Sequence, residues 1–545
     1  MQAPSSSRWP NSAIIVAIVL GFLVLLLGGW SVIAAMRMSR VNAQFDAVRS
    51  DLDEAELRIA DLEDQLSAAE SGGSPLSDLL GGDNSDGLGL EDLLGQLLDG
   101  SGEGGLTGLE DLLGGLLGGE PGDPGDLGGL LGGLDPSGEL GSCLTGTPGS
   151  YEIAANSLEA QVDDIAATVE DLRGLSFPSE VEPVFVSADE MGRRVRALVE
   201  KSYPPDLEDF DTRLLTALGM LPPGYDLMSA QMDLLDSGVA GYYDPDTGEL
   251  VVATPASDEP LAAIDQITLA HEMIHALTDA TLGIPDAIGR PASDPEIARA
   301  QQALIEGDAT LGMQQFSVGA LGFEEQLGML MDPRVLGAQQ EAGEFPYVLS
   351  NGLQLPYLEG MSFTCALYAG GGWEAVDAAY DDPPTNTSQI LYPERYVGER
   401  TAAIAPAPLA SPGGNWDRLR QVGFGAVDLL MLFSAPGDNV DAALSAPRER
   451  ARGWAGGEAV VWSRDGDTAV AIGLVDSGEG SSTLCDSMHT WAIAAFPDHV
   501  VESQDAGQFA HSGQDRAAVV VCEGSNVRIG IGPDVETARS AAGRS

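Results

Sequence analysis

The longest apolar stretch of the chain is residues 13–35, which contain no charged side chain. A helix over these residues would be roughly 35 Å long at about 1.5 Å per residue, which is enough to cross a bilayer. A cleaved signal peptide is the alternative, but its apolar region usually has only about 7–15 residues, and no small-residue cleavage site follows here. We therefore predict a transmembrane anchor in residues 1–36, which holds the chain in a lipid bilayer through residues 13–35.

The next segment, residues 37–70, has apolar side chains that alternate at spacings of three and four positions. This spacing is typical of a coiled-coil seam, with Phe45, Leu52, Ile59 and Leu66 at the a positions. The alternative is an amphipathic helix that packs on the chain's own globular part. A glycine-rich stretch follows at once and separates the helix from any such core. We therefore predict a parallel coiled-coil homodimer through residues 37–70.

Residues 71–148 are rich in glycine, leucine and acidic side chains. Residues 71–142 alone contain 24 glycines and 14 Asp or Glu, with no Lys or Arg. The sequence LEDLLG occurs at Leu90 and again at Leu109, but glycine at this density opposes helix formation. A strip that orders on binding a basic partner is one interpretation. The composition favours the other, a disordered tether that separates the anchor from the rest of the chain.

From Tyr151 onward the pattern becomes that of a folded protein. Apolar residues at helical spacing predict helices over residues 151–172, 191–203 and 211–221. Two β-rich runs within residues 239–254 surround the turn sequence DPDTG, and they predict a hairpin. The sequence thus predicts an α+β protein.

Two domains are expected in this folded part. Residues 149–415 predict a mainly helical domain with a small sheet, in which residues 355–380 form two helices broken by Gly370–Gly372. Residues 416–545 predict a small α+β domain of short strands and turns. The strands are expected over residues 459–476, 490–496, 516–524 and 526–532, and a helical stretch over residues 505–513.

The strongest chemical signal lies in residues 261–280, LAAIDQITLAHEMIHALTDA, which have good helical periodicity. His271 and His275 are four positions apart and share one helix face, so their imidazoles can bind one zinc ion. Glu272 can then act as general base toward the attacking water. Residues 1–488 contain no other histidine, which argues against two incidental surface histidines.

Zinc in a catalytic site needs a third protein ligand and keeps a fourth position for water. The helix predicted from Pro295 supplies Glu306, 31 residues beyond His275, among apolar neighbours where a free carboxylate would be costly. Asp308 is a second candidate, and we expect it in a supporting role. Asp279 lies one turn beyond His275 and is predicted to orient a metal ligand.

The segments AHEMIHAL and ALIEGDA are similar to the gluzincin branch of zinc metallopeptidases, which includes thermolysin and the zinc aminopeptidases. The separation between the second histidine and the glutamate is longer here than in those two families. The order of GYYDP, HEMIHAL, ALIEGDAT, LPYLEG and QILYPERY resembles more closely a family of uncharacterised bacterial HExxH proteins, over residues 177–396. Many members of that family carry His where this chain has Tyr392.

This resemblance implies a zincin-like fold, Zn²⁺ as the cofactor, and hydrolysis of peptide bonds with Glu272 as general base. Related gluzincins stabilise the oxyanion with Tyr or His. Tyr392 is therefore expected in that role, with Tyr357 and Tyr396 as alternatives. By fold analogy, the hairpin strand before the site helix is expected to pair with an extended substrate.

Composition narrows the partners. The chain has 84 Asp and Glu against 26 Lys and Arg, a net charge of -58, which excludes an ordinary nucleic-acid binder because phosphates would be repelled. The other three histidines, His489, His499 and His511, have no metal-binding spacing, and we expect them to be structural or on the surface.

The four cysteines bear on location. No C-x-x-C occurs, so metal clusters are not expected, and an even number beside an anchor favours disulfides and an extracytoplasmic domain. Cys485 with Cys522, and Cys143 with Cys365, is a plausible pairing, but the sequence leaves all three pairings open.

We therefore expect a single-pass protein of the cell membrane whose zinc peptidase domain acts on a peptide or protein substrate outside the cytoplasm. One alternative is a non-catalytic zincin-fold module for cell-envelope interaction, against which the intact Glu272 argues. The other is a zinc hydrolase of non-peptide substrates, which the sequence leaves open.

Overall fold

The computed structural model describes much of the chain beyond the predicted tether. The described residues are 143, 151–154, 157–236, 239–253, 260–288, 294–330, 332–334, 345–398, 400–496, 500–505, 508–513 and 516–544. The predicted anchor (residues 1–36) and coiled coil (37–70) lie outside them, as does the predicted tether except for Cys143. None of the described helices is long and apolar enough to cross a bilayer.

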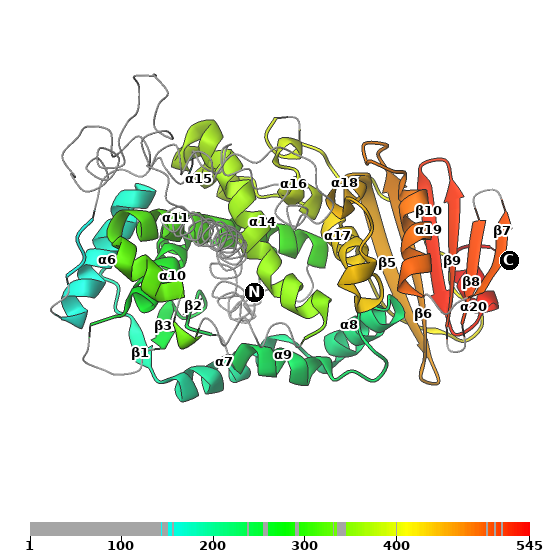
Figure 1. Cartoon of the computed structure of the whole chain (residues 1–545), viewed down its shortest axis with the longest axis horizontal. Coiled ribbons are helices and arrows are strands. Elements are labelled where there is room, and N and C mark those ends of the chain that lie inside the picture. The colour runs from blue at the N-terminus through cyan, green and yellow to red at the C-terminus, as the bar shows by residue number, and fades with distance from the viewer. Residues whose placement is uncertain are drawn as a thin grey trace, which may run out of the picture. The chain divides into compact units, whose positions relative to one another are not determined.

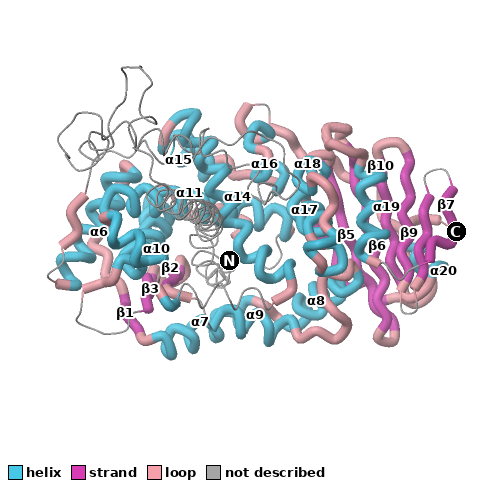
Figure 2. The backbone as a smooth tube through the Cα atoms, viewed as in Figure 1, coloured by secondary structure: helices cyan, strands magenta, loops and turns pink. Residues whose placement is uncertain are grey.

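The fold is α+β, and helices dominate the part that precedes residue 400 (Figures 1 and 2). These helices are α6 (Leu158–Arg173), α7 (Ala188–Ser202), α8 (Pro205–Ala217), α9 (Leu227–Asp236), α10 (Ala263–Thr281), α11 (Pro295–Ala320), α12 (Phe323–Leu330), α14 (Tyr347–Gly371), α15 (Trp373–Asp381), α16 (Thr387–Leu391) and the 3₁₀ turn η3 (Pro393–Arg395). A helix is present in each range predicted to be helical, and the break after Gly371 is confirmed, but residues 151–154 and 218–221 are not helical.

Local sequence accounts for several helix ends. Helix α6 begins after Ser157, whose hydroxyl accepts a hydrogen bond from the Ala160 backbone N–H at 3.2 Å, and it ends at Gly174 with a φ of 68°. Helix α11 begins after Asp294, whose carboxylate accepts a hydrogen bond from the Glu296 backbone N–H at 3.1 Å. The start of the helix that carries Glu306 is thus encoded within a few residues.

A small sheet lies beside helix α10. The predicted hairpin is confirmed, because β2 (Gly241–Asp244) and β3 (Glu249–Ala253) pair antiparallel around a turn in which Gly248 has a φ of 72°. Strand β1 (Val184–Val186) pairs parallel with β3, so the strand order is β1-β3-β2 and β2 is an edge strand.

Gly241 in β2 allows this sheet to approach helix α10 closely. A Cβ at Gly241 would lie 3.0 Å from Cγ2 of Thr268 and 3.2 Å from Cγ of Glu272. A larger residue would therefore push β2 away from the helix that carries Glu272.

A seven-stranded antiparallel sheet follows, with strand order β4-β5-β6-β10-β9-β8-β7. Its strands are β4 (Asp417–Gly423), β5 (Trp454–Arg464), β6 (Asp467–Asp476), β7 (Val500–Asp505), β8 (Gln508–Ser512), β9 (Ala517–Glu523) and β10 (Asn526–Gly532). The helical elements between and after them are α17 (Ala426–Ser434), η4 (Pro436–Asp438), η5 (Val440–Ala442), α18 (Pro447–Ala451), α19 (Leu484–Ala495) and α20 (Val535–Ala541).

Helices cover both faces of this sheet. Successive residues of a strand point to opposite faces. In β9, Val520 belongs to the core that contains Trp491 of α19, whereas Val519 and Val521 pack with Ala538 of α20. Helix α19 lies beside β10 and runs roughly along the strands in Figure 1.

Two predictions for this part are wrong. Residues 490–496 were expected as a strand, but residues 490–495 belong to helix α19, which begins at Leu484 after the N-cap Thr483. The helix is longer than the apolar run and buries residues that are spaced three and four positions apart. Residues 505–513 were expected to be helical, but they contain strand β8, which pairs with β7 and β9. Pairing with the adjoining strands β7 and β9 decides the second case.

The hydrophobic core is continuous across the predicted domain boundary at residues 415 and 416. One cluster joins Phe210 of α8 and Leu355 of α14 to Trp454, Val470 and Ile529 of the large sheet. The predicted boundary remains a prediction. The residues on its two sides nevertheless share one core.

Both plausible disulfides are present. Cys143 pairs with Cys365 in α14, and Cys485 pairs with Cys522, so the structure selects one of the three pairings. The first disulfide links the end of the predicted tether to a helix of the candidate site.

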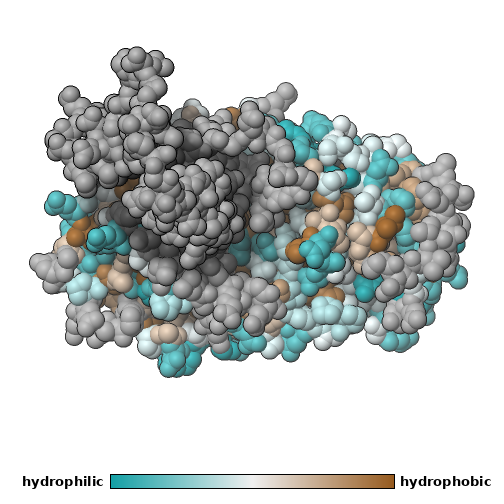
Figure 3. Space-filling model, viewed as in Figure 1, coloured by the Kyte–Doolittle hydropathy of each residue, from teal (hydrophilic) through white to brown (hydrophobic). Residues whose placement is uncertain are grey.

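Hydrophilic side chains cover much of the described surface on the face shown in Figure 3. Within the described ranges, the large apolar side chains that are exposed lie at separate places along the chain, namely Val318, Val397, Ile404, Leu419, Val440 and Ile493. The described surface on this face is therefore hydrophilic, as is usual for a folded protein with an excess of acidic residues.

Candidate metal centre

Helix α10 brings together the three residues of the HExxH motif. Residues 264–278 of this helix are all buried, including His271, Glu272 and His275 at 1%, 0% and 3% exposure. A helix that is buried on every side lies inside the fold and not on its surface. The two histidines are therefore not incidental surface residues.

Helix α11 brings Glu306 to the same place. Glu306 is fully buried, and the next residue, Gly307, contacts Gly360 of α14 so closely that a Cβ at either glycine would overlap the other helix's backbone. This contact fixes α11 against α14 at the level of Glu306. It also explains the glycine in the Glu-Gly-Asp sequence.

The donor atoms of His271, His275 and Glu306 form a compact triangle. The two Nε2 atoms are 3.0 Å apart, and each lies 3.5 Å from Oε2 of Glu306. Two ligands at about 2.0–2.1 Å from a tetrahedral zinc ion are separated by roughly 3.3 Å. Among the described residues, these three form the one His, Cys, Asp and Glu group close enough to hold a metal ion.

The surroundings of the two glutamates also fit a cation. The four carboxylate oxygens of Glu306 and Glu272 accept no hydrogen bond of normal geometry. The backbone N–H of Tyr243 is nevertheless close enough to Glu272 to favour the ionised form of its carboxyl group. A buried carboxylate without a partner is costly. Two imidazoles and one carboxylate are a typical ligand set for catalytic zinc.

Burial and mutual charge shift the pKa of each group. Burial lowers the pKa of His271 to about 4 and raises the pKa of Glu272 to about 8. Burial is the largest influence on His275 and acts to lower its pKa, but the charge and hydrogen bond of Glu306, together with the charges of Glu272 and Asp308, outweigh it and the net shift is upward. For Glu306 the two imidazoles outweigh burial, so its pKa is lowered. A bound dication would favour the neutral form of both imidazoles, since metal-bound histidine is unprotonated at the ligating nitrogen.

Tyr357 of α14 is the tyrosine beside this cluster. Its ring centroid lies 6.1 Å from that of His271, and its hydroxyl interacts with Glu306. Burial and the charges of Glu306 and Glu272 raise its pKa far above the usual value for tyrosine. Tyr357 therefore keeps its proton and is able to donate a hydrogen bond at neutral pH.

Tyr392, the tyrosine predicted as oxyanion partner, has its contacts elsewhere. Its hydroxyl donates to the backbone oxygen of Arg448 at 2.6 Å, and its ring lies 4.9 Å from the guanidinium groups of Arg395 and Arg452. Tyr396, the other alternative, donates to the backbone oxygen of Asp382 at 2.8 Å. The structure thus brings Tyr357 to the cluster and engages the other two tyrosines in packing and backbone contacts.

The two aspartates predicted to support the site have different partners. Asp279 accepts a hydrogen bond from Tyr243 at 2.9 Å, and burial raises its pKa although this hydrogen bond and the charge of His275 oppose the shift. Asp308 is fully buried and pairs with Arg173, whose Nε lies 2.8 Å from Oδ1. Its other oxygen accepts a hydrogen bond from Tyr380 at 2.8 Å.

Arg173 is a structural residue that the sequence did not single out. It comes from the end of α6, is 1% exposed, also pairs with Asp377, and lies 4.0 Å from the ring centroid of Trp373. Helical spacing places Arg173 on the buried face of α6, where an arginine requires an acidic partner. That spacing is the one sequence signal that would have identified it.

His489 and His511 lie apart from this centre. His489 stacks on Phe509 at 3.7 Å between ring centroids and lies 5.5 Å from His511, in the part that contains the large sheet. His499 is outside the described residues.

Comparison with known proteins adds no relative. No protein-family model, no curated protein and no solved structure matches this chain. The case for function therefore rests on the sequence and on the geometry of the site.

Proposed function

We propose that this protein is a zinc-dependent peptidase of the gluzincin type, held at a membrane by its N-terminal segment. The observation that carries the proposal is the buried triangle of His271, His275 and Glu306 donor atoms, with edges of 3.0, 3.5 and 3.5 Å, next to Glu272. A site that only holds a structural metal has no need of the free carboxylate of Glu272.

Each residue has a defined part in this proposal. A zinc ion bound by the triangle would lower the pKa of a water ligand toward about 7 and polarise the scissile carbonyl. Glu272 accepts the proton of the attacking water and then donates it to the leaving amine. Tyr357 takes the role first expected of Tyr392, and its hydroxyl donates a hydrogen bond to the developing oxyanion.

Other features agree with a peptide substrate. Strand β2 is an edge strand of the small sheet and lies against α10 at Gly241, so an extended peptide could add to it.

The two disulfides agree with a domain outside the cytoplasm. The anchor, the homodimer and the location belong to the proposal, as does the zincin-like fold.

The test uses the purified full-length protein in detergent, as wild type and as Glu272→Gln. Both forms are analysed for metal and incubated with a mixture of peptides whose products are identified by mass spectrometry. We expect one zinc per chain in both forms and a loss of cleavage of about 10²–10⁴-fold in the variant. Equal cleavage by two zinc-loaded forms would sink the peptidase proposal, and zinc without any cleavage would favour the non-catalytic alternative.

A further inference from the structure

The candidate metal centre is closed to solvent. His271, Glu272, His275, Glu306 and Tyr357 have exposed fractions between 0% and 3%. A peptide substrate has to bring the carbonyl group of its scissile bond next to a metal ion held at this centre. Some part of the fold therefore has to move before a substrate reaches the metal.

Helix α14 has a weak point directly beside Tyr357. Pro356 lies inside the helix and divides it into a first half, residues 347–355, and a second half, residues 357–371. Pro356 has no N–H to donate to the carbonyl oxygen of Gly352, four residues earlier, and its ring crowds that carbonyl group. Gly352 is exposed, and no atom lies within 4 Å of where its Cβ would be, so close packing does not account for this glycine. The two residues together weaken one turn of the helix, as at a hinge.

The two halves of α14 are held in different ways. In the second half, Gly360 packs on Gly307 of α11 so closely that neither position has room for a Cβ, and Cys365 forms a disulfide. The first half is joined to η4 at the surface by a hydrogen bond that the backbone N–H of Tyr347 donates to Asp438 at 2.7 Å. A movement that begins at Pro356 therefore leaves the second half and its covalent link in place.

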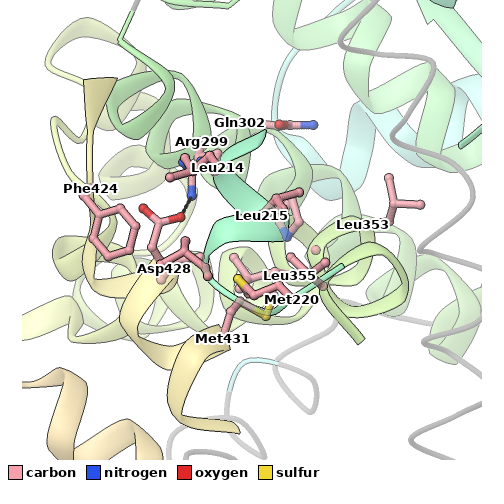
Figure 4. Close-up of a pocket in the computed structure, with 15 residues that line it drawn as sticks. Leu214, Leu215, Met220, Arg299, Gln302, Leu353, Leu355, Phe424, Asp428 and Met431 are labelled. Carbon is pink, nitrogen blue, oxygen red and sulfur yellow. Dashed lines mark hydrogen bonds and ion pairs between the residues drawn. The ribbon is translucent and has the colours of Figure 1, made fainter. Parts of the chain in front are cut away.

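An empty space lies beside the first half. A cavity of about 190 Å³ is enclosed among helices α8, α11, α14 and α17 (Figure 4). The residues that α14 contributes to its wall all belong to the first half or to the hinge, namely Val348, Gly352, Leu353, Leu355 and Pro356. Protein interiors are otherwise closely packed. The first half therefore has room to move on this side without displacing other side chains.

The two hydrophobic cores on either side of α14 give the direction of this movement. Leu355, Val427 and Met431 line the cavity and belong to the core that contains the large sheet. Leu349 and Tyr357 belong to the core that contains the buried residues of α10. A shift of the first half into the cavity therefore draws it toward the large sheet and away from α10.

We propose that the first half of α14 is a lid, which turns about Pro356 into the cavity and opens the metal centre to the substrate. Gly352 and Pro356 set how often the lid opens, because they weaken the turn that holds it in line with the second half. This inference rests on the proposed peptidase function, and it adds how access to the site is controlled.

The test compares the zinc-loaded full-length wild type with Gly352→Ala, Pro356→Ala and Gly370→Ala. Gly370 is the matched control, because it lies in the second half of the same helix, is exposed, and has no atom within 4 Å of its Cβ position. Three quantities are measured for each form: amide hydrogen exchange along α14 by mass spectrometry, the rate of zinc transfer to an excess of chelator, and the rate of peptide cleavage. Melting temperatures confirm that each variant is folded.

For wild type and Gly370→Ala we expect the amides of residues 347–355 to exchange at least about 10-fold faster than those of residues 361–369. Gly352→Ala should slow exchange of the first half about 5-fold and Pro356→Ala at least about 10-fold, in line with helix propensity. Zinc transfer and peptide cleavage should slow in the same order.

Equal exchange in the two halves of wild type would overturn the lid. Slower exchange in the variants with unchanged zinc transfer and cleavage would also overturn it, and the peptidase proposal would stand. Absence of cleavage in every form, with exchange and zinc transfer as expected, would overturn the peptidase proposal and leave the lid standing.

Discussion

Glu306 and Asp308 are two positions apart on helix α11, and both are fully buried, yet the protein neutralises them differently. Asp308 meets the guanidinium group of Arg173 at 2.8 Å and the hydroxyl of Tyr380 at 2.8 Å. Glu306 faces the imidazoles of His271 and His275, at 3.5 Å from each. A carboxylate that serves the fold is satisfied by the protein itself, whereas Glu306 is placed where a cation would complete its surroundings.

The largest expected effect comes from removing the functional member of this pair. Glu306→Ala should reduce peptide cleavage by at least about 10³-fold, or roughly 4 kcal/mol, because it removes the third metal ligand. Without metal, the variant should have a melting temperature no lower than that of wild type. The substitution removes a buried carboxylate and leaves no arginine without its partner. Cleavage rates and melting curves with and without a chelator provide the measurement. A variant that cleaves as well as wild type would mean that Glu306 is not a ligand.

Removing Asp308, the structural member of the pair, should reduce stability and not metal binding. Asp308→Ala should lower the free energy of unfolding by about 3–5 kcal/mol, because it leaves the buried charge of Arg173 without its fully buried partner. Asp377→Ala is the control, since this second partner of Arg173 is 26% exposed and its loss should cost less. Urea unfolding of metal-free protein measures both. Equal losses for the two variants would show that Asp308 has no special part in the fold.

A third buried acid on α11, Glu296, extends the comparison to pH. Burial raises its pKa to about 7 from 4.5, although Arg299 opposes the shift. The unfolded chain therefore loses this proton at a lower pH than the folded chain. The contribution of the protonated Glu296 to the free energy of unfolding is fully present below about pH 4.5. It declines by up to about 3 kcal/mol as the pH rises to about 7.

Glu296→Gln isolates this contribution, because the amide oxygen can still accept the hydrogen bonds that Thr387 donates to Glu296. We expect the stability of the variant relative to wild type to rise between pH 5 and pH 8, as followed by urea unfolding. Parallel pH profiles would mean that Glu296 does not retain its proton in the fold.

The smallest effect concerns the two tyrosines. Tyr357→Phe should reduce kcat/KM by about 10- to 100-fold with zinc content and melting temperature unchanged, because it removes a hydrogen bond to the oxyanion. Tyr392→Phe should leave kcat/KM within about twofold, since the Tyr392 hydroxyl donates to the backbone oxygen of Arg448. The reverse order of effects would restore Tyr392 as the oxyanion partner.

The parts of this molecule that the sequence predicts well are those that depend on local periodicity. The HExxH helix, the helix of Glu306 and the hairpin before them were all predicted, since helical spacing and turn residues specify them within short segments. The grouping of His271, His275 and Glu306 also followed from chemistry, because each needed a partner in a buried setting.

The parts that were missed depend on neighbours distant in sequence. Nothing around Tyr392 shows that its hydroxyl is engaged by Arg448, and nothing around Tyr357 shows that α14 packs on α11 at Gly307 and Gly360. Strand β8 is a different case: its partners β7 and β9 adjoin it in the sequence, but pairing with them and not the residues of β8 alone determines its conformation.

The most direct test of the central claim is the metal content of the full-length protein after equilibration with equal concentrations of zinc, magnesium and calcium. Wild type and Asp308→Asn are predicted to hold one zinc ion per chain, and Glu306→Ala is predicted to hold none. Zinc retained at one per chain by Glu306→Ala, or absent from wild type, would contradict the assignment of His271, His275 and Glu306 as the metal centre.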